Sequence, residues 1–287
     1  MKQGNAWNMP LLQIQPRFLH GEQWSELAAR KGLYYEPVEF YMPPVLGDPQ
    51  LFDEARVWYR NSGRVCSLHG AFIDVNPASG DPEVRKLSQA RCRASCALAA
   101  ALGAKQVVFH SSAFPFLRGA YLDNWAGICG AFYMELAEEY GLIICVENSM
   151  DLDPEPLCAL LRETSGDQVQ VCLDIGHAHY ARAPLEMWFE RLGDRIGYLH
   201  LSDNNGQFDE HLPLGAGSVN WTLADSLWRQ LGRSIPLTLE VGGITAVERS
   251  LVYLKQRGYF GLGVYWIWRN IQSLSGRASC GICPRGS

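Results

Sequence analysis

Short apolar runs alternate with longer amphipathic segments along most of the chain. Runs such as those around Val107 and Ile144 are almost continuously apolar, which is typical of parallel strands covered on both faces of their sheet. The segments between the runs carry apolar residues at helical spacing, and most end at a glycine, the commonest residue just past a helix. This pattern predicts eight strands, at residues 11–15, 34–40, 64–71, 105–111, 142–149, 168–175, 195–202 and 236–241.

Eight helices are predicted by the same pattern, so strand and helix alternate through eight units. This alternation favours a closed (β/α)₈ TIM barrel of the α/β class over an open doubly wound sheet, because the glycine-rich phosphate loop of such a sheet is missing after the first strand. The length of 287 residues suits a single barrel domain, which typically needs about 250. We expect the barrel over residues 1–262 and a C-terminal extension or tail over residues 263–287.

Acids and histidines stand where the predicted strands end. In a barrel, the carboxyl ends of the strands and the loops that follow form one face, where active sites lie. Asp, Glu and His are also the side chains that bind divalent metals. The residues of this kind are His69, His110, Glu147, Asp174, His177, His200, Asp209 and His211 in the loop after strand seven, and Glu240.

Each of these residues also has a structural interpretation. A lone histidine at a strand end is more often hydrogen-bonded structure than a ligand, and Asp174 with His177 could simply cap the next helix. Glu147 and Glu240 differ, because an acid inside an apolar strand is costly to bury unless it meets a cation. The convergence of so many ligand-type residues on one rim favours a functional site over separate structural roles.

Weaker candidates surround this set. Glu39 ends the second predicted strand and could reach the site, and Arg118 is the basic residue nearest to it. Asn148 follows Glu147 and is a candidate substrate contact. We interpret His20 and His179 as loop residues or, alternatively, as substrate contacts. His179 is expected at the start of the helix that follows the sixth strand. Three tryptophans could wall a pocket or merely pack at helix starts, namely Trp7, Trp125 and Trp221.

The composition argues against several classes of protein. A net charge of −5 and a pI near 5.8 give no electrostatic footprint for nucleic acid. No apolar run reaches the roughly 18 residues of a membrane span, and the N-terminus lacks the order of a signal peptide. We therefore expect a cytoplasmic protein.

The nine cysteines suggest reduced thiols. Their number is odd, and Cys66, Cys145 and Cys172 fall inside predicted strands, where they would act as small buried hydrophobes. Cys280 and Cys283 form a CxxC close to the C-terminus, but a closed metal site would need a second pair. We interpret this motif as part of a tail without metal, with a redox or metal knuckle as the alternative.

The order of the motifs resembles the xylose isomerase-like barrel superfamily. The relevant features are a histidine in strands three and four, E-N after strand five, D-x-G-H after strand six, H-x-S-D-N with D-x-H and G-x-G after strand seven, and L-E-V in strand eight. They cover about residues 30 to 245. The superfamily includes sugar isomerases, 3-epimerases, inosose dehydratase-like enzymes and the endonuclease IV family.

The resemblance to the epimerases implies one divalent metal, Mn, Mg, Co or Zn, held by Glu147, Asp174, His200 and Glu240. Glu147 and Glu240 would also be the acid/base pair that moves a proton next to a carbonyl, and His177 would bind a substrate oxygen. The expected activity is that of a metal-dependent isomerase or epimerase. Its substrate would be a small carbohydrate, namely a sugar, a sugar phosphate or a polyol.

The resemblance to endonuclease IV implies three zinc ions instead. His69 and His110 would share Glu147 at the first, the four residues above would hold the second, and His177, Asp209 and His211 would hold the third. The alternative function is therefore a trinuclear zinc phosphodiesterase that cuts at abasic sites. The loops on the ligand face are neutral to acidic, however, which disfavours a grip on duplex DNA.

Two further alternatives stay open. A barrel kept as a subunit or as a ligand-binding protein would not call for two glutamates inside strands beside a metal. The apolar stretch YFGLGVYWIW could cover a partner, so a homo-oligomer is compatible with the sequence.

Overall fold

The computed structural model describes residues 10–263, in which eight parallel strands form one sheet. The order is β2-β1-β8-β7-β6-β5-β4-β3. The two edge strands meet, because Tyr35 donates its N–H to Arg64 O and Cys66 donates to Tyr35 O, at 2.9 and 3.1 Å. The sheet is therefore a nearly closed barrel, and the predicted fold class is confirmed. Its strands are β1 Leu12–Ile14, β2 Tyr34–Tyr35, β3 Ser67–His69, β4 Gln106–His110, β5 Ile143–Glu147, β6 Val169–Asp174, β7 Ile196–Leu201 and β8 Leu237–Leu239.

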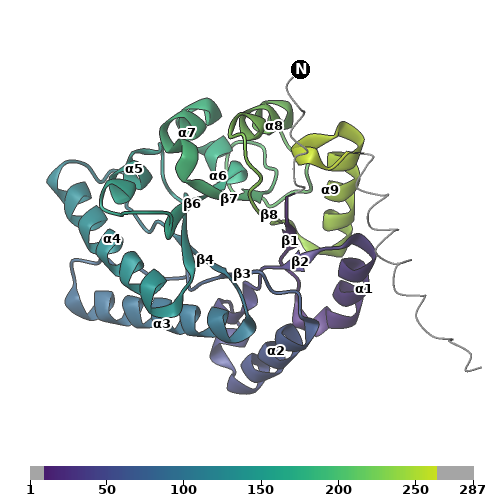
Figure 1. Ribbon diagram of the computed structural model, residues 1–287, viewed down its shortest axis with the longest axis horizontal. Helices are drawn as coiled ribbons and strands as arrows, with labels where there is room; N and C mark the ends of the chain where they lie inside the picture. The colour runs from purple at the N-terminus through teal and green to yellow at the C-terminus, as the bar shows by residue number, and fades with distance from the viewer. Residues whose placement is uncertain (1–9, 264–287) are drawn as a thin grey trace, which may run out of the picture.

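The helices surround the strands (Figure 1). Helix α3 illustrates how the sequence sets their limits: Asp81 accepts the N–H groups of Glu83 and Val84, and Gly103 ends the helix at a φ of 83°. The helices are α1 Gly21–Lys31, α2 Pro49–Ser62, α3 Pro82–Leu102, α4 Ala120–Tyr140, α5 Glu155–Arg162, α6 Ile175–Tyr180, α7 Leu185–Leu192, α8 Trp221–Gln230 and α9 Gly243–Arg257. The six-residue α6 was not predicted; His179 lies inside it rather than at the start of the following helix.

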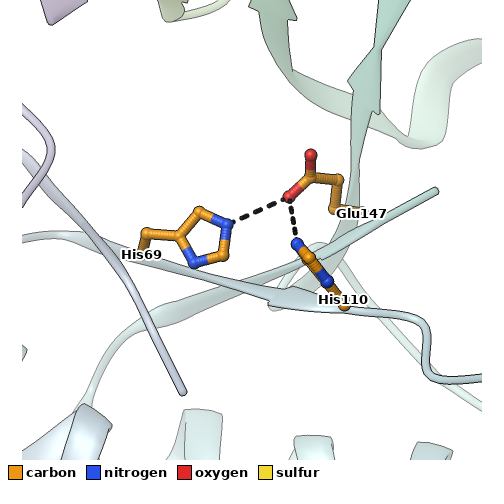
Figure 2. A group of neighbouring side chains, drawn as sticks. All are labelled: His69, His110 and Glu147. Carbon is orange, nitrogen blue, oxygen red and sulfur yellow. Dashed lines mark ion pairs between the residues drawn. The ribbon is translucent and has the colours of Figure 1, made fainter. Parts of the chain in front are cut away.

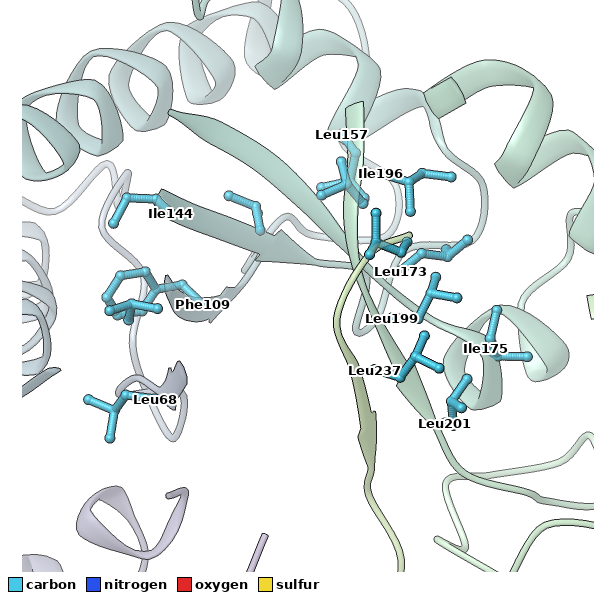
Figure 3. Packing of buried hydrophobic residues seen from close by; sticks show 14 of the residues in the cluster. Leu68, Phe109, Ile144, Leu157, Leu173, Ile175, Ile196, Leu199, Leu201 and Leu237 are labelled. Atoms are coloured by element: carbon cyan, nitrogen blue, oxygen red, sulfur yellow. The ribbon is translucent and has the colours of Figure 1, made fainter. Parts of the chain in front are cut away.

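Alternate strand residues face the helices and the barrel interior. Leu68, Phe109 and Leu199 belong to the large core cluster that packs between strands and helices (Figure 3). A separate cluster fills the interior with Val108, Cys145, Cys172 and Tyr198. Because side chains on a strand repeat every two residues, the next interior layer lies two positions further along each strand. That layer holds His110, Glu147, Asp174 and His200.

The second strand is shorter than predicted. It ends at Tyr35, and Pro37 follows closely, which cannot donate a ladder hydrogen bond. The chain then enters a 3₁₀ turn at Glu39–Tyr41. Glu39 is therefore turned out of the strand, and Glu36 takes the interior position at its end.

Cys145 and Cys172 are buried as predicted, whereas Cys66 is partly exposed. Trp7 and the predicted tail with Cys280 and Cys283 lie outside the described residues. Within residues 10–263, none of the helices combines the length and the apolar character needed to cross a membrane.

Candidate metal centre

Four side chains from neighbouring strands meet at the carboxyl end of the barrel. Glu147, Asp174, His200 and Glu240 each offer one ligand atom, and these atoms all lie within 4.8 Å of one another. Nδ1 of His200 lies 3.2 Å from Oε1 of Glu147 and 2.8 Å from Oε2 of Glu240. Three carboxyl groups and one imidazole form a hard to borderline ligand set that suits a divalent metal.

Two further histidines share one oxygen of Glu147. Nε2 of His69 lies 3.3 Å and Nε2 of His110 lies 3.7 Å from Oε2 of this glutamate. Figure 2 shows the two rings reaching the same carboxylate from different strands. These three residues form a second group with metal-ligand geometry.

A third cluster lies beside the first two. Oδ2 of Asp209 is 3.3 Å from Nε2 of His177 and 2.7 Å from Nε2 of His211. His211 reaches this place from the loop after β7 with a left-handed backbone, at a φ of 48°. All nine residues predicted as ligands are thus brought together at one end of the barrel.

A buried aspartate holds the loop that carries Asp209 and His211. Oδ2 of Asp203 accepts the N–H of Gly215 at 2.8 Å and the indole N–H of Trp221 at 2.9 Å. The loop is thereby tied back to the end of β7. Trp221 anchors this loop rather than walling a pocket.

Asp174 combines two roles that the sequence left as alternatives. Its Oδ1 accepts the backbone N–H of His177 at 2.6 Å, so it caps α6. Its Oδ2 is buried without a hydrogen-bond partner among the described residues, as is Oδ1 of Asp209. Unpaired buried carboxylate oxygens are costly, and a cation compensates them. The residues present therefore fit a divalent metal.

The electrostatics of the centre point the same way. Burial raises the pKa of Asp174 to about 7. Burial also acts to raise the pKa values of Glu147 and Glu240, but His200 outweighs it, so the first lies well below its usual range and the second at about 2. Burial alone would lower the pKa of His200, but Cys172 and the surrounding carboxylates raise it well above normal. The carboxylates of the group are thus compensated by neighbouring histidines, and a divalent metal would supply positive charge in their place.

Glu36 is a residue of this centre that our sequence analysis missed. It is fully buried, and its Oε1 lies 3.0 Å from Nε2 of His200. It also accepts hydrogen bonds from Gln15, Ser67 and Tyr198. A carboxylate on the outer nitrogen of a histidine fixes the ring with its other nitrogen toward a metal. The signal was present, because Glu36 is an acid next to the apolar strand residues Tyr34–Tyr35.

A cavity of about 340 Å³ opens beside the three clusters. Its aromatic lining residues are Trp24 and Phe72; the predicted wall residue Trp125 is buried elsewhere, in α4. The complete lining consists of Gln15, Arg17, Trp24, Val38, Met42, His69, Phe72, His110, His177, Asp209, His211, Glu240, Val241, Gly242 and Gly243.

Two predicted substrate contacts do not reach this cavity. The carboxylate of Glu39 is engaged elsewhere, since Oε1 accepts the N–H of Phe18 at 2.8 Å and the hydroxyl of Tyr59 at 2.6 Å. Arg118 pairs with Asp153 at 2.8 Å on the surface. The predictions of Glu39 and Arg118 as substrate contacts were therefore wrong. The 3₁₀ turn at Glu39 and the path of the loop after β4 depend on tertiary contacts that the sequence pattern does not encode.

Asn148 is also placed differently from our expectation. Its side chain accepts the N–H of Asp174 at 2.8 Å and donates to the carbonyl of the same residue at 3.0 Å. Its own carbonyl lies 2.7 Å from Nδ1 of His177. Asn148 therefore positions Asp174 and His177 and does not line the cavity.

The protein is thus a parallel barrel with potential metal ligands grouped at the carboxyl ends of its strands. The chain belongs to the xylose isomerase-like TIM barrel family, whose sequence profile matches residues 26–257. The resemblance seen in the motifs is therefore confirmed.

Three similar proteins illustrate the family. A relative from Methanocaldococcus jannaschii without a characterised function is 31% identical over 201 residues, which are 66% of this chain and 68% of the relative. The structure of a D-tagatose 3-epimerase-like protein is 25% identical with a TM-score of 0.65, covering 84% of this chain and 90% of that one. A Thermus thermophilus protein soaked with zinc chloride is also 25% identical, with a TM-score of 0.69, covering 94% of this chain and 100% of that one.

Proposed function

We propose that the protein is a divalent-metal-dependent isomerase or epimerase that moves a proton at the carbon next to a carbonyl of a small carbohydrate. The observation that carries the proposal is the meeting of Glu147, Asp174, His200 and Glu240 within 4.8 Å at the carboxyl end of the barrel. The similarity to a D-tagatose 3-epimerase-like protein supports the same class of reaction.

The residues of the centre would divide the steps of this reaction between them. A bound divalent metal would polarise the substrate carbonyl and so acidify the neighbouring C–H. Glu240 lines the cavity and would exchange a proton with this carbon, and Glu147, in the buried layer behind the histidines, is its partner in the acid/base pair. His177 lines the cavity and donates from Nδ1 to the carbonyl of Asn148, and its Nε2, which lies 3.3 Å from Oδ2 of Asp209, would bind a substrate oxygen.

The proposal predicts exchange of a substrate hydrogen with solvent. We expect the manganese-loaded or cobalt-loaded protein to incorporate deuterium from D₂O next to the carbonyl of at least one ketose in a panel of neutral and anionic sugars. Mass spectrometry and NMR would measure the label and any epimer formed. Protein treated with a chelator is the control. Absence of exchange from every ketose with the metal-loaded protein would contradict the proposal.

A second candidate is a trinuclear metal phosphodiesterase, and the observation that favours it is the convergence of all nine ligand-type residues. Three close metal ions would supply a hydroxide nucleophile and neutralise phosphate charge. Incision of a duplex with an abasic site by the zinc-loaded protein would support this function. Failure to incise, together with deuterium exchange from a ketose, would exclude it in favour of the first.

A further inference from the structure

One side of the cavity differs in character from the three clusters of ligand-type residues. These clusters contribute His69, His110 and Glu240 among others, whereas Trp24 and Met42 contribute apolar surface. Among the lining residues, Arg17 is the only lysine or arginine. A volume of about 340 Å³ lies within the range of small-molecule sites. A bound molecule could therefore contact the clusters and Arg17 together.

The guanidinium of Arg17 has no carboxylate partner in the described part of the chain. Its Nη1 lies 3.3 Å from the thioether sulfur of Met42, which is a weak acceptor. None of the ion pairs or cation–π contacts within residues 10–263 includes this arginine. The remaining residues, 1–9 and 264–287, contain no aspartate or glutamate.

The acid on the neighbouring turn is a poor counterion for Arg17. Glu39 directs Oε1 to the N–H of Phe18 and the hydroxyl of Tyr59. Burial raises the pKa of Glu39, and the hydrogen bonds from Tyr59 and Phe18 and the charge of Arg17 offset this rise only in part. By contrast, Arg118 has a carboxylate at 2.8 Å. The partly buried guanidinium of Arg17 has five N–H donors and meets one weak acceptor, the sulfur of Met42. Several of its donors are therefore available to a group that enters the cavity.

We infer that Arg17 binds an anionic group of the substrate, either a carboxylate or a phosphate ester. The planar fork of a guanidinium matches both groups and can form two parallel hydrogen bonds with either. The substrate is thus a keto sugar that carries an acidic group. Its carbonyl end would lie at Glu240 and its anionic group at Arg17. This inference rests on the proposed function for the reaction, but anion binding can be measured without turnover.

The turnover experiment compares three probes: D-fructose, D-fructose 6-phosphate and 5-keto-D-gluconate. In the manganese-loaded wild type, one anionic probe should exceed D-fructose in kcat/KM for exchange. Arg17→Gln should lower kcat/KM for that anion by roughly 10- to 100-fold, mainly through KM, and leave D-fructose nearly unchanged. Arg118→Gln is the matched control and should change neither. Which anion responds distinguishes a phosphate from a carboxylate.

The binding experiment separates the two proposals. Calorimetry of the manganese-loaded protein should show the favoured anion binding more tightly than D-fructose, and Arg17→Gln should abolish the difference. If this holds while no probe exchanges hydrogen, the anion site stands and the isomerase proposal fails. If the wild type shows no preference for either anion over D-fructose, or Arg17→Gln keeps the preference, the inference is overturned.

Discussion

Replacing Glu240 by glutamine is expected to lower kcat by roughly 10²- to 10⁴-fold, the range for loss of a positioned acid or base. Glutamine keeps the size of the side chain but cannot exchange a proton at the substrate carbon. It also removes one negative charge from the group formed with Glu147, Asp174 and His200. Glu240 lines the cavity, and its Oε2 lies 2.8 Å from Nδ1 of His200. The loss of its carboxylate therefore acts directly at the reacting centre. Steady-state kinetics on the ketose that shows deuterium exchange would measure it.

The fold of this variant should stay intact. Glutamine fills the same space, so circular dichroism should match the wild type. The melting temperature should fall, because His200, which outweighs burial and lowers the pKa of Glu240 to about 2, loses an ion-pair partner. Glu190→Gln, on the exposed face of α7, makes the same chemical change outside the centre and should keep full activity. A fully active Glu240→Gln enzyme would contradict the acid/base role.

Removal of the metal is expected to destabilise the protein, and more strongly at pH 8 than at pH 5.5. A ligand that binds only the folded state at 100 to 1,000 times its Kd contributes roughly 3 to 4 kcal/mol. In the metal-free protein, Asp174 has a pKa of about 7, raised by burial from a normal value of 3.8. Its folded state therefore holds a proton that the unfolded state releases, so stability falls as pH rises from about 4 through about 7.

The metal removes this pH dependence, because a ligating carboxylate must be deprotonated. Urea unfolding with and without EDTA at both pH values would measure the difference in unfolding free energy. Asp174→Asn is the control, since it lacks the titrating group and should lose this share of the pH dependence of the metal-free protein. An equal effect of EDTA at both pH values, or none at all, would contradict the account.

The strands and the cluster at their ends could be predicted because both depend on local pattern. Runs such as that around Ile144 have few polar residues until the strand ends, and Glu147 marks that end. In a parallel barrel every strand end lies on the same face, so the convergence of Glu147 with Glu240 follows from topology alone. This is why all nine predicted ligands are found together.

The second strand shows where local pattern was insufficient. Residues 34–40 read as one strand, but Pro37 ends the ladder and a 3₁₀ turn begins at Glu39. A shift of three residues exchanges the roles of the two acids. Glu36 reaches His200, and Glu39 packs against Tyr59. The choice between them depended on a backbone turn rather than on side-chain type.

The cation of the cavity was also misplaced by the sequence analysis. Arg118 follows β4 and was expected near the site, yet its loop carries it to Asp153. Arg17 lies before α1, in a segment without any motif, and lines the cavity. Loop paths are set by tertiary contacts that periodicity does not encode. The short α6 was missed for a similar reason, because six residues are too few to show a helical period.

The most direct test of the metal centre is the number of metal ions per chain. Elemental analysis would be done on protein purified without chelator or added metal. We expect about one divalent ion per chain, held by Glu147, Asp174, His200 and Glu240, as a mixed carboxylate and imidazole shell predicts. About three ions, mostly zinc, would contradict the isomerase account and favour phosphodiester hydrolysis, and a chain that binds no metal even when it is added would contradict both.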